Sequence, residues 1–134
     1  MFFVVRRATL LIPSGPIEDL ARKHLFICVT DPVGRERETL LVSVSTTRAG
    51  EPCDPTCRLF PGDHPFIRQE SYVNYHQARI EPAGKLERGV KKGIFTPHEI
   101  LDGAIFARVC NGLIESRLLA PRYLIFYRNT TGSE

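Results

Sequence analysis

The segment 40–48 alternates between apolar and hydroxyl-bearing side chains. Its apolar positions are Leu40, Val42 and Val44, and the positions between and after them include Ser43, Ser45 and Thr47. Successive side chains of a strand point to opposite faces of a sheet, so this pattern predicts a strand that feeds a core on one face and presents hydroxyls on the other. A chain with such a segment has to build a sheet.

Proline and glycine divide the rest of the chain into further short strands and one helix. The expected strands cover residues 9–13, 24–30, 40–48 and 71–80, with a short strand-like patch at 58–60. With 134 residues, of which 43% are hydrophobic, the chain has enough hydrophobic residues to form one core. We therefore expect a single domain over 1–134, mainly β with a C-terminal helix, as a small barrel or a strongly twisted antiparallel sheet.

The helix is predicted from a capping signal. Thr96 as N-cap, Pro97 at the first helical position and Glu99 three residues after the cap form a capping box. Apolar residues at helical spacing follow, which predicts a helix over about 97–118. The apolar tail 122–128 is expected to add an edge strand or to pack on a partner.

The strand 71–80 is expected to present an arginine beside an amide. Regular alternation places Val73, Tyr75, Gln77 and Arg79 on one face and His76 on the other. Gln77 and Arg79 would then meet a base edge and a phosphate together, while the structural alternative for Arg79 is a solvated edge position.

The charge of the chain permits a polyanionic partner without requiring one. The formal net charge is +3, and most of the cations are arginines, which suit bidentate contact with phosphate. The opening MFFVVRR has its basic pair after a short apolar run, the reverse of a secretory signal, so we expect a cytoplasmic protein without a membrane partner. Its four cysteines are then expected to be free thiols.

The loop between the third and the last long strand offers two further interpretations. Cys53, Cys57 and His64 could supply three zinc ligands, but no second pair completes a four-ligand site, and we predict no metal and no cofactor. Aromatic residues near this loop could stack bases, although filling the core is the default role of aromatics on strands. They are Phe60, Phe66, Tyr72 and Tyr75.

The order of these elements, with HQAR at 76–79, resembles the PemK/MazF-type growth-inhibitor toxins. The resemblance covers roughly residues 9 to 118, and its motifs are short. It implies an SH3-like small barrel of the PemK/MazF/CcdB kind. It also implies a metal-independent endoribonuclease of a type II toxin-antitoxin pair that cuts single-stranded RNA to a 2′,3′-cyclic phosphate, is inhibited by an antitoxin protein and forms a homodimer.

The resemblance also implies residue roles. Lys23, with Arg22 before it, stands where the family has a catalytic arginine followed by proline. Ser45 or Thr46 matches the family's hydroxyl at the end of the third strand, with Thr47 beside them as a further RNA contact. Positions 76–79 match the family's Asp-Gln-x-Arg, so His76 and Gln77 are implied RNA contacts and Arg79 a catalytic cation.

The departures from the family pattern leave two questions open. Lysine supplies a point charge without the guanidinium fork, so Lys23 is not equivalent to the family's arginine. The family's acidic residue is absent here, so a histidine would take the acid/base role, and the candidates are His24, His64 and His76. The position of His64 in a loop, where we expect it to be exposed, favours His64. The alternative function is a non-catalytic barrel module that binds a protein or nucleic-acid partner.

Overall fold

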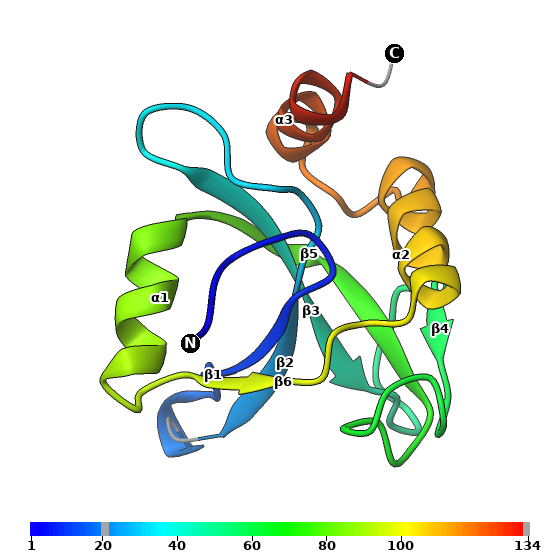
Figure 1. Cartoon of the computed structure of the whole chain (residues 1–134). Helices are drawn as coiled ribbons and strands as arrows, with labels where there is room; N and C mark the ends of the chain where they lie inside the picture. Colours follow the sequence, from blue (N-terminus) through cyan, green and yellow to red (C-terminus); the bar gives the residue numbers. More distant parts are fainter. Residues whose placement is uncertain (20–21, 133–134) are drawn as a thin grey trace.

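Six antiparallel strands form one sheet that curls into a half-barrel (Figure 1). The computed structural model describes residues 1–19 and 22–132. In the sheet the strands follow the order β4-β5-β3-β2-β1-β6. Their bounds are β1 Thr9–Pro13, β2 Lys23–Cys28, β3 Glu38–Thr46, β4 Arg58–Leu59, β5 Ser71–Pro82 and β6 Thr96–His98. The five strands expected from the sequence are confirmed, and β6 is an addition.

The described residues also form a short 3-10 helix at Ile17–Asp19 and three α-helices: α1 Ala83–Lys91, α2 Gly103–Glu115 and α3 Pro121–Thr131. Figure 1 shows α1 on one side of the sheet, with α2 and α3 on the other. The mainly β class with helical C-terminal elements is thus confirmed, while the prediction of one helix is wrong.

The two faces of the sheet carry separate cores. Leu25, Val42 and Tyr75 belong to the core that packs against α2 and α3. Leu10, Phe26 and other side chains of the opposite face pack with α1 and the N-terminal segment. Each of these side chains is buried, because a strand that is covered on both faces of the sheet needs apolar side chains on both faces. The hydroxyl face predicted for β3 is therefore partly covered.

A bulge in β5 changes which side chains share a face. Leu41 pairs with Arg79 and Ser43 pairs with Asn74, so residues 75–78 lie opposite Val42 alone. Three extra residues, an odd number, reverse the alternation along the strand. The prediction that Tyr75 and Arg79 share a face is therefore wrong: Tyr75 lies in the α2 core, and Arg79 lies on the face of Asn74 and Ser43.

The capping box predicted at Thr96 does not form. Thr96–His98 is the edge strand β6, paired with β1, and an edge strand tolerates Pro97 because its missing N–H has no ladder partner to lose. The helix α2 begins instead after Asp102, whose side chain accepts hydrogen bonds from the backbone nitrogens of Ala104 at 3.0 Å and Ile105 at 3.3 Å.

The C-terminal tail is helical, so of the two alternatives predicted for it the edge strand is wrong. Pro121 stands at the start of α3, where its fixed backbone angle favours a helix, and Tyr127 is buried against the core of α2. Helix α1 was missed because Gly84 and Gly89 weaken its local helix signal. Gly89 is required by packing, since a β-carbon there would collide with the ring of Phe95.

Candidate nucleic-acid interface

A polar hollow of about 270 Å³ opens on the α1 face of the sheet, beyond the part that α1 covers. We call it the Arg79 hollow. Its lining comes from β1–β2, β3 and β5: Ser14, His24, Phe26, Ser43, Ser45, Asn74, Gln77 and Arg79. The bulge in β5 is what brings Gln77 and Arg79 to this face.

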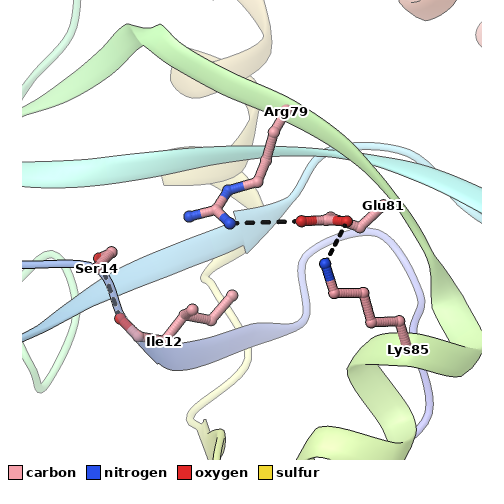
Figure 2. Close-up of polar contacts among 5 residues, drawn as sticks. All are labelled: Ile12, Ser14, Arg79, Glu81 and Lys85. Atoms are coloured by element: carbon pink, nitrogen blue, oxygen red, sulfur yellow. Dashed lines mark hydrogen bonds and ion pairs between the residues drawn. The ribbon is translucent and has the colours of Figure 1, made fainter. Parts of the chain in front are cut away.

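The guanidinium of Arg79 is held by an aromatic ring and a carboxylate. It lies 4.4 Å from the centre of the Phe26 ring and donates to Glu81 at 3.4 Å. Glu81 also accepts from Lys85 of α1 at 3.1 Å (Figure 2). Because Glu81 is shared between two cations, this cluster keeps a net positive charge.

The hydroxyl of Ser14 holds the ring of His24. It lies 3.1 Å from the carbonyl of Ile12 (Figure 2), to which it can donate, and 2.7 Å from Nδ1 of His24. In the tautomer in which Ser14 donates to Ile12 and accepts from Nδ1–H, Nε2 carries the free lone pair. Burial, and then the charge of Arg22, lower the pKa of His24 and favour the neutral ring at pH 7. This histidine is suited to accept a proton.

A second hollow, of about 280 Å³, adjoins the first at the end of β3. We call it the Lys23 hollow; His24 and Ser45 line both. It has three cations and one carboxylate in its lining: Arg22, Lys23, Arg48 and Glu51. Asn74 donates to the hydroxyl of Ser45 at 3.3 Å, which orients that hydroxyl where the two hollows meet.

A third hollow, of about 370 Å³, continues from the second. We call it the Gln69 hollow; Thr46 and Phe66 line both. Arg68, Gln69 and His98 are among its other lining residues. The three hollows together follow the end of β3 from the α1 face of the sheet to its rim.

The structure gathers most of the predicted site residues around these hollows. Arg22 and Lys23 line the second hollow, and Gln77 and Arg79 line the first. Ser45 lines both, and Thr46 lines the second and third. These six residues come from three strands and the turn before β2, which is the convergence a binding site needs.

His64 is not exposed, contrary to the expectation from its loop position. It is 3% exposed and lines none of the three hollows. Its Nε2 donates to the carbonyl of Glu99 at 2.7 Å, and its Nδ1 accepts from the backbone nitrogen of Phe66 at 3.0 Å. Burial lowers its pKa, and the bond to Glu99 opposes this in part. Both ring nitrogens are therefore occupied in holding the loop.

His76 and Thr47 also lie away from the three hollows. His76 is exposed within the bulge of β5. The hydroxyl of Thr47 is buried and, among the residues that the structure describes, has no hydrogen-bond partner. Neither side chain joins the groups around Ser45.

Three residues of the site were missed or left undecided by sequence reasoning. His24 stood as one of three candidate histidines, and its place beside the predicted Lys23 on a strand was the signal for it. Asn74 shares a face with Arg79 only because of the bulge that separates them. Arg48 directly follows the hydroxyl-bearing residues 45–47, and this position was the signal for it.

The described residues do not form a cluster of side chains that could bind zinc. Within residues 1–19 and 22–132, no three His, Cys, Asp or Glu side chains gather as metal ligands would. The thiols of Cys53 and Cys57 are free, and burial raises the pKa of Cys57. In the same described ranges, no helix has the length and apolar character needed to cross a bilayer.

Comparison with known proteins gives no relative from which a role can be transferred. No protein-family model matches the chain, and no curated protein matches its sequence.

Proposed function

We propose that this protein binds single-stranded RNA along the Lys23 and Arg79 hollows and cleaves it without a metal ion. The observation that carries the proposal is the position of Ser45, which lines both hollows between the cations of one and the histidine and arginine of the other. A phosphate placed there would meet positive charge from two sides and a hydroxyl between them.

The chemistry would be attack of a ribose 2′-hydroxyl on the adjacent phosphate. Nε2 of His24 accepts the proton of that hydroxyl while the bond from the 2′ oxygen to phosphorus forms. Lys23 and Arg79 stabilise the charge that develops on the phosphate oxygens. The bond to the 5′ oxygen then breaks, and that oxygen takes a proton from water, which leaves a 2′,3′-cyclic phosphate and a 5′-hydroxyl.

The resemblance to the PemK/MazF-type toxins supports the same proposal. The residues matched on sequence, Lys23, Ser45 and Arg79, are those that converge on the two hollows. We further propose that the half-barrel is a divergent SH3-like fold of that kind, with an antitoxin protein and a second copy of the chain as partners in the cytoplasm.

Cleavage of a mixed-sequence single-stranded RNA in the presence of a metal chelator tests the activity. We expect products ending in a 2′,3′-cyclic phosphate, and a loss of about 100-fold or more in rate for His24→Asn, because a positioned base contributes roughly that much. Lys23→Ala and Arg79→Ala should each slow cleavage by a similar factor, since each removes charge from the transition state.

Lys92→Ala is the matched control, because Lys92 is exposed and lines none of the three hollows. It should cleave as the unaltered protein does. Intact RNA, together with RNA affinity that neither Lys23→Ala nor Arg79→Ala changes, would refute the proposal.

A second candidate function has one specific observation in its favour. Arg79 already has Phe26 and Glu81 as partners, an arrangement that also suits a fixed binding surface without catalysis. A non-catalytic module would bind RNA or a protein partner and would not arrest growth when overproduced, whereas a nuclease toxin would. Growth of cells producing the unaltered protein or His24→Asn separates the two functions.

A further inference from the structure

The Gln69 hollow differs in chemistry from the Lys23 hollow that it adjoins. Three of the residues that line the Lys23 hollow are cationic: Arg22, Lys23 and Arg48. The Gln69 hollow has one arginine, Arg68, and its walls include the apolar side chains Val44, Pro65, Phe66 and Ile67. A phosphate suits the first lining, and a flat heteroaromatic ring suits the second.

The aromatic wall of the Gln69 hollow is held in place. Phe66 is 38% exposed, and its ring forms a T-shaped pair with the ring of His98, with the centres 5.9 Å apart. The backbone nitrogen of Phe66 donates to Nδ1 of the buried His64. An exposed ring that is fixed at its backbone and in contact with a second ring loses little freedom when a base stacks on it.

Polar groups at the rim can pair with a base edge. The amide of Gln69 has donors and an acceptor, and the hydroxyl of Thr46 offers either. The backbone of Gln69 is fixed by the hydroxyl of Ser71, which donates to the Gln69 carbonyl at 2.9 Å. Phe66 and Thr46 also line the Lys23 hollow, so a base in one hollow and a phosphate in the other would be neighbours on one strand.

We propose that the Gln69 hollow is a nucleobase subsite, in which a base of single-stranded RNA stacks on Phe66 and pairs with Gln69. The inference rests on the proposed function and adds the part of the substrate that is recognised. Phosphate contacts position the strand, and this hollow reads one of its bases.

Binding of two uncleavable hexamers tests the subsite separately from the site as a whole. One is a mixed-sequence 2′-O-methyl RNA, and the other is the same sugar-phosphate chain without bases, both followed by fluorescence anisotropy. Phe66→Ala should weaken binding of the base-bearing hexamer by about tenfold and leave the abasic hexamer unchanged. Phe66→Leu keeps an apolar side chain without the ring and should show most of the same loss.

Phe60→Ala is the control, because Phe60 is exposed, lies on the same connection and lines none of the three hollows. It should bind both hexamers as the unaltered protein does, and Lys23→Ala should weaken both. If Phe66→Ala weakens both hexamers equally or neither, the subsite is refuted while RNA binding stands. If the unaltered protein binds neither hexamer, the proposed function and the subsite are refuted together.

Discussion

The two faces of the sheet are built from the same strands but are covered to different extents. The α2 face is covered across three strands, where it buries Leu25 of β2, Val42 of β3 and Tyr75 of β5. On the α1 face, helix α1 and the N-terminal segment cover Phe26 and Leu41 and then stop, and the Arg79 hollow opens beside them.

Phe26 lies on the boundary between the covered and open parts of the α1 face. It belongs to the α1 core and also carries the guanidinium of Arg79 on its ring. A cation over a ring stays partly solvated while its apolar neighbours are buried. The larger buried core therefore lies on the α2 face, whereas the groups able to do chemistry lie where the α1 face is uncovered.

The largest effect on stability is expected on the α2 face. Leu113→Ala should lower the free energy of unfolding by about 2–5 kcal/mol, because Leu113 is fully buried and the substitution leaves a cavity. Its neighbour Ile114 is 39% exposed, so Ile114→Ala should cost less than about 1 kcal/mol. Urea denaturation measures both, and equal losses would contradict the assignment of α2 to the core.

On the α1 face, two glycines of one helix should respond in opposite directions. Gly89→Ala should destabilise the protein by about 1–3 kcal/mol, because the new methyl group would collide with Phe95. Gly84→Ala meets only the flexible end of Arg88 and should gain up to about 1 kcal/mol of helix propensity. Thermal unfolding compares them, and stabilisation by both would mean that Phe95 does not pack on α1.

The buried His64 should make stability fall in acid. Its pKa is lowered in the folded protein, so below the ordinary value of 6.5 the unfolded chain takes up the proton first. The free energy of unfolding should therefore fall as the pH drops below 6.5, by about 1 kcal/mol for the bond from Phe66 that protonation of Nδ1 breaks.

His64→Gln removes this titration and should flatten the pH dependence, measured as urea midpoints between pH 7.5 and pH 5 (roughly the window around the ordinary histidine pKa). His76→Gln, at an exposed position of the bulge, is the control and should keep the slope. His24 contributes with the same sign, because its pKa is also lowered, so part of the slope should remain. An unchanged slope in His64→Gln would contradict the role of His64.

The smallest effect on stability is expected in the open part of the α1 face. Arg79→Ala removes a partly exposed ion pair and should change the free energy of unfolding by less than about 1 kcal/mol. The same variant should lose RNA affinity, since the hollow loses the guanidinium that lines it. A large loss of stability would instead make Arg79 a structural residue.

Much of the sheet could be predicted because alternation and apolar runs are local signals. Residues 9–13 and most of 40–48 form the expected strands. The start of the helix could not be read in the same way, because Thr96 and Asp102 are both good N-caps. Pairing of Thr96–His98 with β1 decides between them, and that contact joins residues far apart in the sequence.

The candidate site also has some features that the local sequence predicts and others that depend on residues far apart in the chain. Lys23, Ser45 and Arg79 lie around the two hollows where a sequence pattern suggested a common site. The position of His64 depends on the carbonyl of Glu99, beyond β6, so its burial could not be inferred from its own loop. The face of Arg79 depends on how many residues oppose Val42, which only the paired strand reveals.

The bulge of β5 also determines where a change in the length of this chain can be absorbed. Removing one residue from 75–78 would leave an even number of extra residues opposite Val42, and Asn74 and Arg79 would then be four positions apart. Residues at even spacing on a strand share a face, so both would stay on the α1 face. Loss of the exposed His76 should therefore leave the position of Arg79 unchanged.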